Sequence, residues 1–315
     1  MPEAPLSLRL HAVTYAAADT CLYEFRDPDG AALPPYEPGA HIDVHMPGGL
    51  QRQYSLARPY EAGKGYLVGI KLDRSSRGGS RYMIQQARPG QTFEVGGPRN
   101  HFPLKQDAPH TVLFAGGIGV TPIWCMAQRL EALGASFELH YAVRERTDAA
   151  FLDRLERMAP RVRLHVDVEA EGVLDVAALV NAAPADAHLY CCGPGPMMDA
   201  FVEATAGCPE DHIHVEYFTA PVLPPPEGGF TVVLAKSGRE LLVPEGKTIL
   251  DTLRAAGVST TSSCEQGVCG ACETRVIEGV PYHHDILLTP AEKAAGKTMM
   301  ICCSGSLSDR LVLDL

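Results

Sequence analysis

Short runs in which hydrophobic and polar residues alternate fill the first third of the chain. Alternating runs cover residues 6–12, 41–46 and 92–95, a nearly continuous apolar run covers 66–72, and Pro or Gly turns separate them. A period of two with evenly spaced turns is typical of a small antiparallel barrel, since alternate side chains of a strand face opposite sides. We therefore expect a β-barrel over residues 1–107.

The middle of the chain has a different pattern, in which apolar runs alternate with stretches of helical period. Strands are expected at 111–115, 137–143, 162–168 and 187–191, and helices at 122–133 and around 148–158. Strands that alternate with helices favour a parallel sheet covered by helices. Residues 108–220 are therefore predicted to form an α/β domain.

A proline-rich segment, 221–229, separates this domain from the carboxyl-terminal part. Consecutive prolines favour a stiff extended backbone, and the two glycines at the end of the segment favour a flexible chain there, so we expect a linker. Beyond it, 230–235 and 240–243 are expected to form a hairpin and 248–256 a helix. A third domain is thus predicted over residues 230–315.

Cysteines mark the third domain. Four residues separate Cys264 from Cys269 and two separate Cys269 from Cys272, while 29 residues separate Cys272 from the pair Cys302 and Cys303. This is the spacing of a plant-type [2Fe-2S] cluster. A zinc knot usually uses two Cys-x2-Cys pairs, and a disulfide framework needs an oxidising compartment, so both fit less well. Neighbouring residues of a strand point in different directions, so only one of Cys302 and Cys303 can be the fourth ligand.

The net charge, the amino-terminal residues and the length of the apolar runs argue against a nucleic-acid-binding, secreted or membrane-spanning protein. Net charge is −11, and residues 108–226 carry 7 basic and 16 acidic side chains, so no basic surface for nucleic acid is expected. An acidic face could attract a basic protein partner or only keep the protein soluble. We see no secretory leader and no apolar run of the roughly 20 residues that a membrane helix needs. A cytoplasmic protein with reduced cysteines is expected.

Two turns in the α/β domain have the composition of nucleotide-binding turns. Gly116, Gly117 and Gly119 follow a predicted strand and precede a predicted helix, where backbone amides can approach a phosphate. Glycine in such a turn can also serve packing alone. The second turn begins at Cys192, at the carboxyl end of another predicted strand, where ligands of open α/β sheets gather.

A short strand of the barrel places Arg52 and Tyr54 on one face and Ser55 on the other. An arginine can hold a phosphate and a tyrosine can pack against a flat ring, which favours a flavin site. By composition alone the same residues could belong to an ordinary surface turn.

Taken together and in order, these motifs resemble the phthalate dioxygenase reductase family, which includes vanillate demethylase reductases. The resemblance covers essentially the whole chain. Its motifs are 52–56 (RQYSL), 77–80 (RGGS), 98–102 (PRNHF), 116–122 (GGIGVTP), 191–194 (CCGP), 262–272 (SSCEQGVCGAC) and 311–315 (LVLDL). Where this family commonly has arginine after the serine that follows its fourth cysteine, this chain has Gly305.

The resemblance implies a flavin barrel, a nicotinamide-binding α/β domain and a β-grasp ferredoxin domain. It implies FMN on Arg52, Tyr54, Ser55, Lys71, Gly79 and Ser80. It implies NADH on Gly116, Gly117, Gly119, Thr121, Cys192, Gly193, Pro194 and Asp167. The cluster ligands would be Cys264, Cys269, Cys272 and Cys302. The residues at the reacting atoms would be Ser55, Cys192 and Phe218, although a phenylalanine there could equally be a packing residue.

The expected activity is that of a reductase that takes a hydride from NADH onto FMN and passes single electrons through the cluster. Arg144 and Arg146 would suit NADPH whereas Asp167 and Glu169 would suit NADH, and the resemblance favours NADH. The expected partner is a Rieske-type terminal oxygenase acting on an aromatic acid, with the reductase a monomer. A quaternary-amine monooxygenase or a cytochrome P450 as partner, and a [2Fe-2S] redox sensor, are the alternatives.

Overall fold

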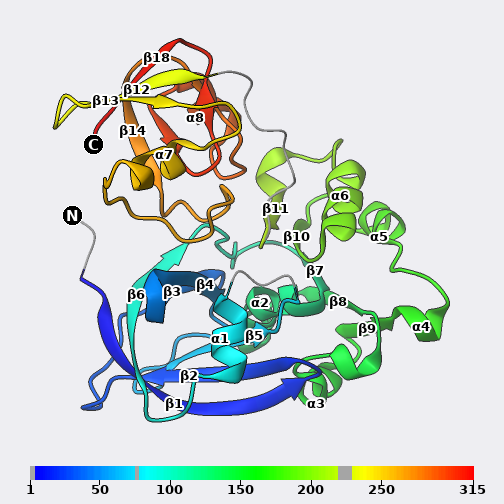
Figure 1. Ribbon diagram of the computed structural model, residues 1–315. Coiled ribbons are helices and arrows are strands. Elements are labelled where there is room, and N and C mark those ends of the chain that lie inside the picture. The colour runs from blue at the N-terminus through cyan, green and yellow to red at the C-terminus, as the bar shows by residue number, and fades with distance from the viewer. Residues whose placement is uncertain (1–3, 75–77, 219–228) are drawn as a thin grey trace. The chain divides into compact units, whose positions relative to one another are not determined.

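Six antiparallel strands form the first sheet of the computed structural model, which describes residues 4–74, 78–218 and 229–315 (Figure 1). In spatial order the strands are β4 (Leu50–Ser55), β3 (Ala40–Met46), β6 (Thr92–Asn100), β1 (Leu6–Ala17), β2 (Thr20–Arg26) and β5 (Tyr66–Lys71). The sheet closes on itself, because Leu56, directly after β4, forms a bridge with Val68 of β5. The predicted barrel is confirmed, and helix α1 (Gly79–Gln85) lies beside it.

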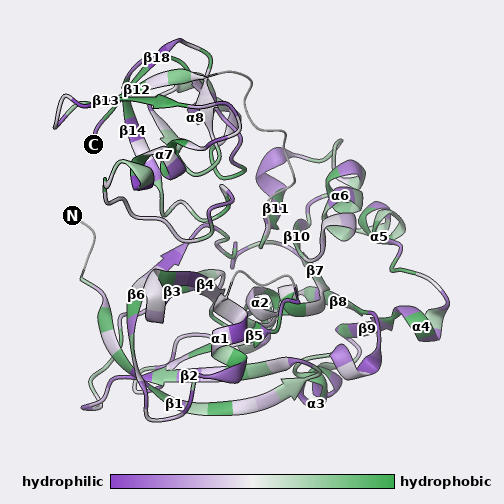
Figure 2. Ribbon diagram, viewed as in Figure 1, coloured by the Kyte–Doolittle hydropathy of each residue, from purple (hydrophilic) through white to green (hydrophobic). Residues whose placement is uncertain are grey.

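The second sheet is parallel throughout and has five strands. Their order is β11 (Ile213–Glu216), β10 (His188–Cys192), β7 (Thr111–Gly116), β8 (Phe137–Val143) and β9 (Val162–Val166). The accompanying helices are α2 (Val120–Leu133), α3 (Leu152–Leu155), α4 (Asp167–Ala170), α5 (Val176–Ala182) and α6 (Gly195–Ala204). Two separate apolar clusters cover its two faces, one with α2 and the other with α5 and α6. Figure 2 shows hydrophobic and hydrophilic residues mixed along α5 and α6, as expected of helices that bury one face.

The barrel and the parallel sheet share one apolar core. Ala57 and Phe102 of the barrel segment pack in the same cluster as Trp124 of α2. Both sheets accordingly belong to one compact unit, which ends at Phe218. The domain boundary at residue 107 stays a prediction.

One predicted helix, around 148–158, is replaced by three short pieces. A 3-10 turn covers Arg146–Asp148, α3 covers only Leu152–Leu155, and a second 3-10 turn covers Glu156–Met158. The reason lies at Phe151, whose φ of 63° is left-handed and cannot continue a right-handed helix.

The second unit carries a mixed five-stranded sheet. Its order is β13 (Glu240–Val243), β12 (Phe230–Leu234), β18 (Arg310–Leu313), β14 (Glu273–Glu278) and β16 (Thr298–Met300). The strands β15 (Pro281–Tyr282) and β17 (Gly305–Ser306) form a separate pair, and the helices are α7 (Ile249–Ala255) and α8 (Pro290–Ala295). In the described part of this unit, residues 229–315, β12 and β18 are the one pair of strands that run parallel. The predicted linker 221–229, apart from Gly229, lies outside the described residues, as does Arg77.

Candidate functional site

Three strands of the first unit end at one place. Ser55 is the last residue of β4, Cys192 of β10 and Glu216 of β11. The Ser55 hydroxyl donates a hydrogen bond of 3.3 Å to Glu216 Oε2, and Cys192 is the direct strand neighbour of Glu216. A hydroxyl of the barrel and a carboxyl of the parallel sheet therefore meet at the carboxyl ends of β10 and β11, where open α/β sheets bind ligands.

The protein environment where these three strands end favours the uncharged forms of Glu216 and Cys192. Burial raises the pKa of Glu216 to about 8, while the Ser55 hydroxyl acts in the opposite direction. Burial also raises the pKa of the Cys192 thiol, and the neighbouring Glu216 carboxyl adds to the effect. At neutral pH the site thus holds a protonated carboxyl beside a hydroxyl, which is an arrangement that can move a proton.

The two predicted nucleotide turns lie against each other. A Cβ on Gly119 would approach the Cys192 carbonyl oxygen to 2.2 Å, and one on Gly116 would approach Pro194 Cδ to 2.4 Å. A Cβ on Gly193 would be 3.3 Å from Gly116 Cα. These three glycines therefore allow the two turns to approach each other closely. This is the role in packing, rather than in phosphate binding, that the sequence also allowed for them. Gly117 differs, since its φ is 52° and the space around it is open.

Arg52 and Gly79 of the predicted flavin site are brought together. A Cβ on Gly79 would lie 2.5 Å from Arg52 Cγ and 3.0 Å from its Nε, so the guanidinium passes over the first residue of α1. An arginine beside the amides of a helix start is suited to a phosphate. Ser80 follows there, and its hydroxyl accepts a hydrogen bond from the Asp73 amide.

Tyr54, also predicted to bind the flavin, has a hydroxyl that is unpartnered within the described part of the chain. Its side chain packs against the barrel core, and burial raises its pKa. Among the described residues its buried hydroxyl has no hydrogen-bond partner. Because buried hydroxyls are nearly always bonded, this one fits a ligand that supplies the missing partner.

The remaining predicted residues have other contacts. Lys71 forms an ion pair of 3.0 Å with Asp148, and the Thr121 hydroxyl donates to the Ile118 carbonyl at 3.0 Å. Asp167 lies 3.4 Å from His165 Nε2. Phe218 is 40 % exposed, so it is not a core residue.

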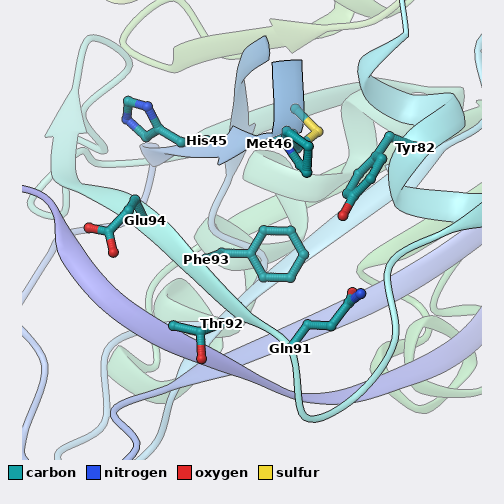
Figure 3. A pocket seen from close by; sticks show the side chains of 8 residues that line it. His45, Met46, Tyr82, Gln91, Thr92, Phe93 and Glu94 are labelled. Carbon is teal, nitrogen blue, oxygen red and sulfur yellow. The ribbon is translucent and has the colours of Figure 1, made fainter. Parts of the chain in front are cut away.

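A groove of about 400 Å³ lies elsewhere on the barrel (Figure 3). The Phe93 ring lies in the middle of the lining residues, with Met46 and Tyr82 on one side of it and Gln91 and Thr92 on the other. No residue of the predicted flavin site lines this groove.

In the second unit the predicted ligand thiols converge. Cys264 lies in hydrogen-bond contact with Cys269 and Cys302, and Cys302 in contact with Cys272. Amides point at the sulfurs, as Gln266 N donates to Cys264 Sγ at 3.3 Å and Cys264 N to Cys269 Sγ at 3.4 Å. Such donors and four thiols are what a [2Fe-2S] cluster requires. Within the described ranges no group of three or more His, Cys, Asp or Glu side chains is placed so that it could hold one metal ion.

Comparison with known proteins agrees with this geometry. Residues 232–305 match the model of the 2Fe-2S iron-sulfur cluster binding domain. The chain is 51 % identical to the phenoxybenzoate dioxygenase subunit beta of Ectopseudomonas oleovorans, over 99 % of this chain and 98 % of that protein. The solved structure of phthalate dioxygenase reductase superposes with a TM-score of 0.75 and 37 % identity, over 98 % of both chains. The chain belongs to the phthalate dioxygenase reductase family.

Membership of this family fixes the class of reaction. The protein is an oxidoreductase that carries electrons from NADH through a flavin to a [2Fe-2S] cluster. A larger enzyme contains a similar chain: an intact type IV self-sufficient cytochrome P450 monooxygenase matches at 42 % identity and a TM-score of 0.86. That match covers 99 % of this chain and 41 % of the P450 chain. Among the described residues no helix is long and apolar enough to cross a membrane.

Proposed function

We propose that this chain is the NADH-dependent reductase of a Rieske-type terminal oxygenase that hydroxylates or demethylates an aromatic acid. The contact between Ser55 of the barrel and Glu216 of the parallel sheet carries the proposal. It supports a single site where a nicotinamide held by the sheet faces a flavin held by the barrel. The full-length similarity to a phenoxybenzoate dioxygenase subunit supports the class of substrate.

Each group of residues has a role in this proposal. Arg52 and the amide of Gly79 would hold the flavin phosphate, and Tyr54 would pack on the ring system with its hydroxyl directed to the ligand. One phosphate cradle at the start of α1 favours FMN over the larger FAD. When bound, the flavin accepts the hydride of NADH and releases its two electrons singly.

The chain's own contribution at the reacting atoms is position and proton control. The protonated Glu216 carboxyl would pass its proton to the Ser55 oxygen as the Ser55 hydroxyl releases its own proton toward the ligand, while Cys192 closes the base of the site and keeps out water. Gly117, which has open space around its Cβ position, would offer its backbone amide to the NADH phosphates. Phe218, two residues beyond Glu216 and exposed, would cover the rings.

The four thiols of Cys264, Cys269, Cys272 and Cys302 would hold the cluster, and the amides of Gln266 and Cys264 would stabilise the charge on its sulfurs. Relatives in this family are reductase components of oxygenase systems, so an oxygenase is the proposed electron acceptor of this chain. A cytochrome P450 is the second candidate partner, because the solved P450 that includes a similar chain is 42 % identical to it.

The monomer and the cytoplasmic location also stay proposals. None of the ten cysteines forms a disulfide, which suits a reducing compartment.

The test begins with an anaerobic titration of the purified protein with NADH, followed by visible absorbance and EPR, and with chromatography of the released flavin. About three electrons per chain are expected, two for the flavin and one for the cluster. An uptake of two electrons without an EPR signal would contradict the relay. Mixing the reduced protein with a purified Rieske oxygenase or with a P450, and following its reoxidation, then decides between the partners.

A further inference from the structure

A buried carboxylate, Asp285, lies in the segment between β15 and α8 and has no role in the function proposed above. Its side chain is 0 % exposed. Oδ1 accepts hydrogen bonds from the amides of Leu287 at 3.2 Å and Leu288 at 2.8 Å. Among the described residues Oδ2 has no hydrogen-bond partner. An acidic side chain is rarely enclosed in this way without a reason, because burial of a charge is costly.

Asp285 lies against the loop that carries the first three cluster cysteines. A Cβ on Gly267 would meet the Cα of Asp285 at 3.0 Å and its Cβ at 3.2 Å. The amide of the next residue, Ile286, donates to the Gly267 carbonyl at 3.2 Å. Gly267 has a φ of 71°, so the loop needs glycine both for its backbone conformation and for this approach. Asp285 therefore braces the cluster loop at the turn between Cys264 and Cys269.

The charged surroundings of the carboxylate are few. The Cys303 thiol lies on the same side of Gly267, 2.5 Å from the position of the absent Cβ, and interacts electrostatically with Asp285. His283 Nδ1 is 3.5 Å from Oδ2. Lys293 donates from Nζ to the Asp285 backbone carbonyl at 2.5 Å and also acts on Cys303. A carboxylate and one ammonium thus lie beside the loop, in a place that excludes most solvent.

We propose that Asp285 is a positioning residue of the cluster loop and that its charge lowers the reduction potential of the [2Fe-2S] cluster. The inference rests on the assignment of that cluster to Cys264, Cys269, Cys272 and Cys302. Reduction adds one negative charge to the cluster, and a fixed carboxylate in a low-dielectric surrounding opposes this. Lys293 acts in the opposite sense. The pair would set how readily electrons leave the flavin for the cluster.

The experiment compares the full-length holoprotein with Asp285→Asn, Lys293→Met and the control Asp309→Asn. Asp309 is an exposed acid of the same unit, so its substitution changes the net charge equally. Iron and acid-labile sulfide are counted first. The cluster potential is then measured by dithionite titration with redox mediators, read by EPR. Iron-free wild-type protein would refute the cluster assignment itself, which separates that failure from a failure of this inference.

With full iron content, Asp285→Asn should raise the cluster potential by at least 59 mV, a tenfold change in a one-electron equilibrium constant. Lys293→Met should lower it and Asp309→Asn should leave it unchanged. A wild-type potential in fully loaded Asp285→Asn, or an equal rise in Asp309→Asn, would overturn the proposal. If Asp285→Asn retains no cluster, Lys293→Met decides: a lowered potential supports the proposal and an unchanged one overturns it.

Discussion

The Ser55 hydroxyl reaches the Glu216 carboxyl over 3.3 Å although the two residues are 161 positions apart in the chain. One residue closes a strand of the antiparallel barrel and the other closes the edge strand of the parallel sheet. The two sheets are thereby joined by a polar contact at the candidate hydride-transfer site, in addition to their common apolar core. A change at either residue should alter the chemistry more than the fold.

Replacement of Glu216 by Gln should slow the reduction of the flavin by NADH by about 10²-fold, in the range typical of a lost acid–base group. The amide keeps the size and a hydrogen-bond acceptor for Ser55 but holds no transferable proton. Anaerobic stopped-flow absorbance measures the rate. Glu210→Gln, an exposed acid before β11, is the matched control. Equal rates in all three proteins would remove Glu216 from the mechanism.

The stability of the first unit should depend on pH through the same carboxyl. The pKa of Glu216 is raised by burial from 4.5 to about 8, so the folded protein retains a proton that the unfolded chain loses. The stabilising contribution of protonated Glu216 is complete at a pH below 4.5, the pKa of this carboxyl in the unfolded chain. It is lost as the pH rises through about 8, the pKa in the folded protein. Thermal unfolding across this window should show a decline in the wild type that Glu216→Gln lacks. Parallel curves for the two proteins would argue against the raised pKa.

Gly119→Ala should destabilise the first unit by about 1–3 kcal/mol, the usual cost of overpacking. The new Cβ would lie 2.2 Å from the Cys192 carbonyl oxygen, so one of the two turns must move. Urea unfolding gives the change in free energy. Gly172→Ala, with no atom near its Cβ position, should change little. A harmless Gly119→Ala would show that the turns are not held in contact.

Cys302→Ser should lose the cluster, whereas Cys303→Ser should retain the full iron content. Cys302 contacts both Cys264 and Cys272 and is 4 % exposed. Cys303 is more exposed, and its thiol is directed to the Met300 carbonyl and the Ser304 hydroxyl. Iron analysis and EPR of the reduced proteins distinguish the two. Loss of iron in Cys303→Ser alone would reverse the ligand assignment.

Glu169→Gln should improve the use of NADPH. The Glu169 carboxylate holds Arg146 through two hydrogen bonds of 2.7 and 3.0 Å, beyond the ends of β8 and β9. An unpaired arginine near the ribose is the usual device for a 2′-phosphate. We expect kcat/KM for NADPH to rise roughly tenfold, equal to ~1.4 kcal/mol, with little change for NADH. Steady-state kinetics with an artificial acceptor tests this, and unchanged NADPH kinetics would place the ribose elsewhere.

The sequence predicts best where local pattern determines structure. The spacing of Cys264, Cys269 and Cys272 points to their convergence, and the bounds of β8 are those expected from its apolar run. It predicts least where distant segments meet. Strand β11 has four residues, two of them polar, so its pattern is too short to predict a strand, and Glu216 is not predicted as a site residue although it pairs beside a predicted turn. Only the pairing of Cys192 with Glu216, and the reach of Ser55 across two sheets, reveal it.

The place of β18 within the second unit has a consequence for how the cluster is acquired. This strand lies in the middle of its sheet, between β12 and β14, yet the chain reaches it only after every one of the cluster cysteines. During synthesis the four thiols therefore emerge before the sheet that supports them can close. We therefore expect the loop to hold its cluster stably only in chains in which β18 has paired with β12, so that stable cluster content reports on completion of this unit.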